Sequence, residues 1–269
     1  MNKDTIIALA KKYLEESPAN YIAAENALHP SYVGLKIYEN PIFAFGATDD
    51  ELYLKYKSSA IIGSHFMSPL EWLPSAKTVI AFFLPYTAEI RKANALDFDW
   101  PAEEWLHGRY EGNFFLRKLT KYLVACLVEA NFATIAPAID KRLEIGNALL
   151  GTEFTSNWSE RHIAYASGLG TFGLSKGIIT AKGTCGRLGS LVTELDLPKD
   201  SRAYTNAYEY CTKCGICIDN CPARAISATE GKKDQPCADF LDTVLEKHQP
   251  RYACGKCQIK VPCENVIPQ

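Results

Sequence analysis

Several classes of protein are excluded by what this sequence lacks. No apolar run approaches the roughly 18 residues that a membrane-spanning helix requires. The chain opens on the polar residues 1–4 with neither an apolar export segment nor a paired-arginine signal, so we expect a cytoplasmic protein in a reducing compartment. A formal charge of −2 leaves no basic excess for broad nucleic-acid binding. The sequence also has no internal repeat and no low-complexity tract.

Cysteine, by contrast, is concentrated near the C-terminal end. Four cysteines and a proline form the motif C-x2-C-x2-C-x3-C-P at Cys211, Cys214, Cys217, Cys221 and Pro222. This is the ligand pattern of bacterial two-cluster ferredoxins, in which the fourth cysteine binds the other cluster. The trailing proline suits the first turn of a helix. The motif therefore predicts iron–sulfur clusters and the passage of electrons through the protein.

Four further cysteines are enough for a second cluster. With the ferredoxin crossover, we assign one 4Fe-4S cluster to Cys211, Cys214, Cys217 and Cys263, and the other to Cys221, Cys237, Cys254 and Cys257. Zinc also binds paired cysteines, but a zinc site has no use for the third closely spaced one, and disulfides belong to oxidising compartments. Cys126 and Cys185 stand apart, and Cys126 lies in an apolar helical stretch where a buried free thiol is expected.

The first 200 residues exceed what two clusters need, so they are expected to form a domain with its own core. Helical periodicity or strand-type composition marks segments 4–16, 77–85, 103–131, 133–139 and 178–197. Segment 77–85 is continuously apolar, as a buried central strand would be, and 178–197 indicates two strands bracketing a glycine-rich turn. Interleaved helices and strands predict a layered α/β domain over 1–200 and a cluster domain over 201–269, with the boundary near 198–208.

A glycine-rich segment carries the remaining chemistry. Gly168, Gly170 and Gly173 resemble a dinucleotide-binding fingerprint but follow a helix-like stretch rather than a strand, so that interpretation fails its context. Glycine lets a backbone approach a flat or bulky group closely. A tight helix-to-strand turn against the core explains the same residues, and both explanations stay open.

Several segments recur in the order found in epoxyqueuosine reductases. They are Glu160-Arg161, the loop 168–173, residues 76–86, residues 107–110 and the cluster cysteines, including Cys237. The chain resembles the short branch of this family over most of residues 70–265. The resemblance implies an α/β (α+β) fold, with a nitroreductase-like, corrinoid-binding core followed by a two-cluster ferredoxin-like domain. It also implies a reductase in which two 4Fe-4S clusters reduce the cobalt of a base-off cobalamin, which then reduces a substrate.

The resemblance further implies which residues line the corrinoid. Those expected there are Arg161, Gly168, Leu169, Gly170, Thr171 and Gly173, with Arg109 and Tyr110 on a neighbouring helix. Arg109 would alternatively form a surface ion pair at the start of that helix. A low-potential ferredoxin or flavodoxin is the implied electron donor.

Two departures from the family affect the substrate and the proton donor. The C-terminal helical repeats that help the full-length enzymes grip transfer RNA are absent from the sequence, which favours a small or unknown substrate over transfer RNA. The run that holds the family's catalytic aspartate is replaced here by residues 154–159. Asp140 takes its place if 141–155 is an insertion; otherwise Glu153 or Tyr165 is the candidate.

Two alternatives remain at this stage. In the first, the protein is a ferredoxin-type carrier that delivers electrons to a partner, such as a corrinoid protein, and performs no substrate chemistry. In the second, the core binds flavin in place of cobalamin.

Overall fold

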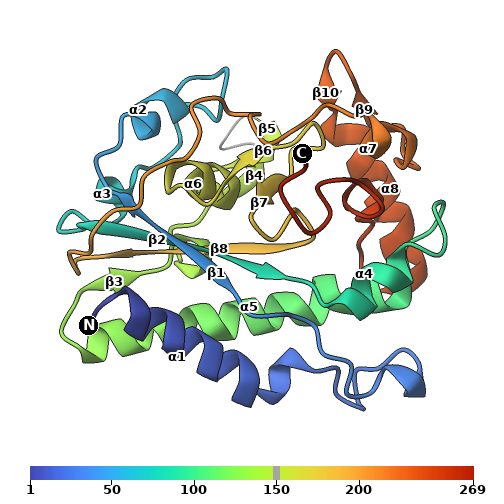
Figure 1. The fold of residues 1–269 in the computed structure, drawn as a ribbon, viewed down its shortest axis with the longest axis horizontal. Coiled ribbons are helices and arrows are strands. Elements are labelled where there is room, and N and C mark those ends of the chain that lie inside the picture. Colours follow the sequence, from blue (N-terminus) through green and yellow to red (C-terminus); the bar gives the residue numbers. More distant parts are fainter. Residues whose placement is uncertain (148–151) are drawn as a thin grey trace.

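A central antiparallel sheet organises the fold (Figure 1). The computed structural model describes residues 1–147 and 152–269. Four strands lie in the order β1 (Ile42–Ala47), β2 (Thr78–Pro85), β8 (Gly186–Thr193) and β3 (Thr134–Ile135). Each neighbouring pair is antiparallel, with Ala81 opposite both Ala44 and Ser190.

Strand β2 is buried along its whole length, which confirms the prediction for 77–85. Successive side chains of a strand point to opposite faces. Ile80 and Phe82 therefore enter the core on one face of the sheet, and Val79 and Ala81 enter the core on the other. An entirely apolar strand at the centre of a sheet implies that both faces are covered.

Helices supply the two covers. The predicted helices 4–16 and 103–131 are confirmed as α1 (Lys3–Glu16) and α5 (Glu103–Glu129), which lie together on one face of the sheet (Figure 1). The opposite face is covered by α2 (Leu52–Tyr56), α3 (Pro69–Trp72) and α6 (Glu160–Ala166). Two hydrophobic cores, one on each face of the sheet, result.

The remaining elements, apart from α8 with its 15 residues, are short. They are η1 (Pro18–Asn20), η2 (Pro30–Tyr32), α4 (Ala88–Asn94), η3 (Pro137–Ile139), β4 (Ile145–Asn147), β5 (Thr152–Ser156), β6 (Gly170–Phe172), β7 (Ile178–Thr180), α7 (Ile216–Asp219), β9 (Ile226–Ser227), β10 (Gly231–Lys232), α8 (Asp234–His248) and η4 (Lys256–Gln258). Strand β4 pairs with β5, β6 with β7, and β9 with β10.

Two strand predictions require correction in detail. The strand expected at 133–139 covers only two residues, because Pro137 has no N–H to continue a ladder and instead begins a 3-10 turn. The strands expected within 178–197 are present as β7 and β8, but they belong to different sheets. The glycine-rich turn therefore carries the chain from one sheet to another.

The cysteine-rich segment packs directly on the core. Helices α7 and α8 lie at one end of the molecule beside α4 and the start of α5 (Figure 1). Arg251, after α8, donates from Nε to Glu111 Oε1 of α5 at 3.0 Å. On the same helix, His107 bonds Glu111 at 3.0 Å and accepts the Leu28 N–H at 3.1 Å. This buried network holds three distant parts of the chain together.

The domain boundary predicted at 198–208 stays a prediction. Within this segment Tyr204 is buried and donates a hydrogen bond to the carbonyl of Tyr165, so the segment packs against the core. Within the ranges that the structure describes, no helix combines the length and the apolar character needed to cross a bilayer.

Candidate metal centres and adjoining cavity

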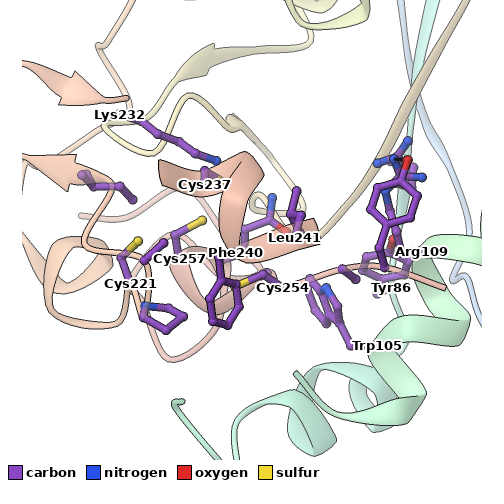
Figure 2. A pocket seen from close by; sticks show the side chains of 18 of the residues that line it. Tyr86, Trp105, Arg109, Cys221, Lys232, Cys237, Phe240, Leu241, Cys254 and Cys257 are labelled. Carbon is purple, nitrogen blue, oxygen red and sulfur yellow. Dashed lines mark hydrogen bonds between the residues drawn. The ribbon is translucent and has the colours of Figure 1, made fainter. Parts of the chain in front are cut away.

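Four cysteines from three segments surround one pocket. Cys221 follows α7, Cys237 lies on α8, and Cys254 and Cys257 flank the start of η4. All four line a pocket of about 190 Å³. Figure 2 shows their side chains on one side of this pocket, with Trp105 and Arg109 of α5 on the other. This set is the one that the ferredoxin crossover predicts for a single cluster.

The loop between Cys254 and Cys257 is tightly fixed. Gly255 has a φ of +67°, and a Cβ on it would lie 2.0 Å from Cζ2 of Trp105, so only glycine is accommodated. The next residue, Lys256, is fully buried and donates from Nζ to the carbonyl oxygens of Asn94 at 2.7 Å and Asp97 at 2.6 Å. These bonds anchor the cysteine loop to the end of α4.

The other four cysteines surround a second, smaller pocket. Cys211, Cys214, Cys217 and Cys263 line a pocket of about 20 Å³, together with Gly173. Three of them come from one tight loop, in which Gly215 has a φ of +83°. The fourth is held from outside the loop, because the N–H of Thr184 donates to the carbonyl of Cys263 at 3.0 Å. The structure thus gathers both predicted sets, and it leaves Cys214 exposed.

The thiols of both sets are crowded and shielded. Burial, reinforced by neighbouring cysteines, raises the pKa of Cys254 and of Cys263 to about 12. A thiol must be deprotonated to bind metal, so the positive charge of the metal has to offset this cost. Among the described residues, no three His, Cys, Asp or Glu side chains are close enough to hold a single metal ion. A cubane differs, because its four thiolates are spread around a four-iron core.

The two remaining cysteines behave differently. Cys185 is buried beside the cluster segment and donates from its thiol to the carbonyl of Gln258 at 2.8 Å. Cys126 is only half-buried, so the expectation of a buried thiol there is wrong. It lies near the end of α5, beside the buried Leu123 and Leu127 that carry the core-facing side of the helix there.

A larger cavity adjoins the first cysteine pocket. It consists of two neighbouring compartments of about 520 and 480 Å³. We call the first the cluster-side compartment, because Cys257 lines it, and the second the helix-side compartment, because α5 lines it. Their shared wall includes Ser156, Trp158, Glu160, Arg161, Arg187 and Leu188. Arg187 also lines the cysteine pocket, so all three spaces meet at this residue.

Unsatisfied polar atoms are concentrated in the cluster-side compartment. Both carboxylate oxygens of Glu160, Nε of Arg187 and Oγ1 of Thr184 are buried without a hydrogen-bond partner, and all three residues line this compartment. Buried polar groups in proteins nearly always have partners. A polar ligand is the simplest source of the missing ones. Burial raises the pKa of Glu160 to about 7, an effect that Ser190 and Trp158 partly oppose.

The predicted arginines reach the cavity. Arg161 lines both compartments and donates from Nη1 to the carbonyl of Lys176 at 3.0 Å. Arg109 lines the cysteine pocket and the helix-side compartment, and its Nη2 donates to the hydroxyl of Tyr252 at 3.1 Å. A surface ion pair at Arg109 is therefore not what the structure contains. Tyr110 lines none of the pockets described above and packs instead on the ring of Phe114.

The glycine segment forms a helix-to-strand turn. Gly168 has a φ of +92° directly after α6, and a Cβ on Gly170 would lie 2.2 Å from the carbonyl oxygen of Ile179. Leu169 and Thr171 are buried in the same turn. Of the loop residues expected to contact a corrinoid, Gly173 alone lines a described pocket, the smaller cysteine pocket. Core packing accounts for this loop, and contact with a corrinoid stays a prediction.

Asp140, the predicted proton donor, is placed unfavourably. Arg142 donates to its carboxylate from Nε at 3.0 Å and from Nη2 at 3.1 Å, and this pairing lowers the Asp140 pKa. Asp140 lines neither described compartment, although Ala138 and Ile139 do line one. A carboxyl group that is paired with arginine and lines neither compartment is a poor acid for chemistry inside the cavity.

The other two candidates do not replace Asp140. The side chain of Glu153 lies outside the described part of the structure. Tyr165 is buried, stacks on Tyr204 with ring centroids 5.2 Å apart, and lines neither compartment. Sequence reasoning did not place the carboxyl group of Glu160 at a cavity, and it missed Arg187 altogether. The only signal was the Glu160-Arg161 pair, which did not reveal how deeply the carboxyl group is buried.

Comparison with known proteins agrees with this arrangement. Residues 207–227 match the 4Fe-4S binding domain family. Over 104 residues the chain is 33% identical to a trichloroethene reductive dehalogenase of Dehalococcoides mccartyi, covering 38% of this chain and 18% of that protein.

Solved structures resemble nearly the whole chain. Epoxyqueuosine reductase from Bacillus subtilis matches with a TM-score of 0.54 and 18% identity, over 99% of this chain and 66% of that one. A reductive dehalogenase described as B12-dependent matches with a TM-score of 0.56 and 14% identity, over 84% of this chain and 30% of that one. The chain thus shares their fold but spans only about two thirds of the reductase and less than a fifth of the curated dehalogenase.

Proposed function

We propose that the protein is a corrinoid-dependent iron–sulfur reductase. The observation that carries the proposal is the junction at Arg187, where a pocket lined by four cysteines meets a cavity with unsatisfied polar walls. A cluster in that pocket would lie against whatever occupies the cavity. One of the solved structures that share this fold is a reductive dehalogenase described as B12-dependent, which favours a corrinoid as the ligand of the cavity.

The eight cysteines would hold two 4Fe-4S clusters in series. The set that contains the exposed Cys214 is suited to receive electrons from a low-potential ferredoxin or flavodoxin. The set that contains Cys257 borders the cavity and would deliver them. Clusters of this type span potentials from roughly −700 to +450 mV, so they can reach the low values that reduction of a corrinoid requires.

The cavity walls suit a large ligand with a polar rim. Ligand pockets commonly measure about 300–1,000 Å³, and the two adjoining compartments together reach the upper part of this range. Amide groups around a corrin ring can both donate and accept, which would satisfy Nε of Arg187 and the hydroxyl of Thr184. When bound, the corrinoid would supply the two-electron chemistry, while the protein orients it and excludes water.

The charge of the helix-side compartment favours an anionic substrate. Arg109, Arg117, Arg161 and Arg187 all line it, and Glu160 is the one acidic residue among its described lining residues. Guanidinium groups recognise carboxylates and phosphates in a bidentate manner. A small substrate with such a group is therefore favoured, and transfer RNA remains a less supported alternative.

Anaerobic reconstitution followed by titration with cobalamin tests the proposal. We expect eight iron atoms per chain and a changed corrinoid absorption spectrum, with Cys254→Ala losing about half of the iron and Cys126→Ala, the matched control, losing none. A corrinoid spectrum that stays unchanged at high protein concentration would overturn the proposal. Extraction of flavin from protein purified under anaerobic conditions would instead support the flavin alternative.

A further inference from the structure

We infer that Glu160 is the proton donor for the reduction that takes place in this cavity. The inference rests on the proposed function and adds a residue role that neither the cysteine motif nor the resemblance assigns. Its basis is a carboxyl group that borders both compartments while both of its oxygens lack a partner.

Position singles out this carboxyl group. Glu160 is the first residue of α6, in the wall that the two compartments share. No other described Asp or Glu lines either compartment. Any reaction in the cavity that takes its proton from a carboxylic acid of the described chain must take it from Glu160.

The neighbours of Glu160 leave its proton uncommitted. The indole N–H of Trp158 donates to Oγ of Ser190 at 3.0 Å, and these two side chains lower the pKa of Glu160 only in part. The hydroxyl of Ser159 is engaged with Nδ1 of His162 at 2.8 Å. Burial disfavours the ionised form of this carboxyl group by more than its polar neighbours Ser190 and Trp158 offset.

The surrounding cations do not form an ion pair with it. The charged groups that face the cluster-side compartment are Arg161, Lys176, Arg187 and Lys232. Arg161 bonds the backbone of Lys176, whose own ammonium pairs with Asp234 at 2.7 Å. Arg187 forms no ion pair within the described structure.

The titration behaviour of Glu160 agrees with this geometry. Burial raises its pKa to about 7, and Ser190, Trp158 and the charge of Arg187 oppose the rise only in part. An acid with a pKa close to the working pH holds its proton before reaction and regains it afterwards, which is the best condition for general acid catalysis. Asp140, with its lowered pKa, fails this condition.

The proposed step balances in atoms and charge. Two electrons arrive one at a time from a low-potential ferredoxin or flavodoxin through the clusters. The bond between a substrate carbon and its leaving atom breaks, and the leaving group departs as an anion. Glu160 supplies the proton of the new C–H bond and, as a carboxylate, regains one proton from water. The sum is R–X + 2e⁻ + H⁺ → R–H + X⁻.

Two measurements on the reconstituted protein test the role. The first is infrared difference spectroscopy between pH 5 and 9, which detects protonated carboxyl groups directly. We expect a buried carboxyl band that disappears with a midpoint near pH 7, is lost in E160Q and is kept in E129Q. Glu129 is the matched control because it lies exposed at the end of α5, away from the cavity.

The second measurement is turnover of a small anionic organohalide, bromoacetate, with a chemical reductant. We expect E160Q to lower kcat by about 10²- to 10⁴-fold without changing iron content or cobalamin binding, and E160D to restore part of the rate. Wild-type kcat should fall as pH rises through 7, and E160Q should lose this limb.

Defined results would overturn the inference. The first is an ionised Glu160 at pH 6 in the infrared spectrum, and the second is turnover by E160Q at the wild-type rate. The third is a loss of rate in E160Q that is matched by an equal loss of cobalamin binding, because this result would indicate a structural role for Glu160. If wild type does not reduce bromoacetate, or if E160Q does not fold, the infrared titration of wild type decides alone. Failure of cobalamin to bind wild type would instead refute the proposed function.

Discussion

Two glycines in the cluster loops, Gly255 and Gly215, allow a controlled test of how the cysteines are held. Both have a positive φ, +67° and +83°. A Cβ on Gly255 would lie 2.0 Å from the ring of Trp105, whereas a Cβ on Gly215 would have no atom within 4 Å. Alanine at either position therefore pays the same backbone penalty, and only Gly255→Ala adds a steric clash.

The expected magnitudes follow from these two contributions. A left-handed backbone costs an alanine roughly 1–2 kcal/mol, which is the whole cost expected for Gly215→Ala. Overpacking at a contact this short adds about 1–3 kcal/mol, because Trp105 is buried and cannot move freely. Each kcal/mol shifts the melting temperature of a chain of this size by about 2–4 °C. We expect Gly255→Ala to lower the apparent Tm by several degrees more than Gly215→Ala.

Anaerobic thermal unfolding at one fixed scan rate, together with iron analysis, measures the difference. Gly255→Ala should also lose the iron held by Cys254 and Cys257 while keeping the iron of the other set. Replacing Trp105 by leucine in the Gly255→Ala background should recover part of the lost stability. Equal Tm values for the two single variants, or no recovery by the leucine, would refute the steric argument.

Three further outcomes are expected. Lys256→Met leaves buried carbonyl acceptors unpaired, so it should destabilise the protein by about 2–4 kcal/mol in denaturant titration, whereas Met at the exposed Lys118 should change little. Asp140→Asn should leave turnover unchanged and lower the free energy of unfolding by at most about 1 kcal/mol. Because Arg142 lowers the Asp140 pKa, the stabilisation from this ion pair is present at neutral pH and is lost as the pH falls through the lowered pKa. Asparagine should remove this pH dependence of stability. Arg117→Gln should weaken binding of bromoacetate in calorimetry, whereas Lys118→Gln should not.

The cysteine grouping could be predicted because cluster ligands obey local spacing rules. One tight loop presents Cys211, Cys214 and Cys217, so these three were expected to lie together, and Cys221 was expected to join the other set. The burial of strand β2 could also be predicted from the sequence, because an unbroken apolar strand in a layered domain has to be covered on both faces.

The acid at the cavity could not be found in this way. Glu160 on α6 and Arg187 on β8 are brought together by tertiary packing, and nothing in their local sequence reveals that their polar atoms lose water. Asp140 was a candidate because it takes the place of the family's catalytic aspartate if residues 141–155 are an insertion. Pro137 shortens the strand predicted before Asp140, and Arg142 then occupies the carboxylate. Position along the chain does not reveal the side chains that surround a carboxyl group.

The interleaving of the two cysteine sets has a consequence for how the protein matures. The ligands of one set end at Cys257 and those of the other at Cys263, and each set also draws on the motif that begins at Cys211. Neither set is complete on a nascent chain until almost all of the core has been synthesised. Clusters held by these sets would therefore be completed only late in synthesis, and a chain cut between Cys221 and Cys237 would leave both pieces without a full ligand set.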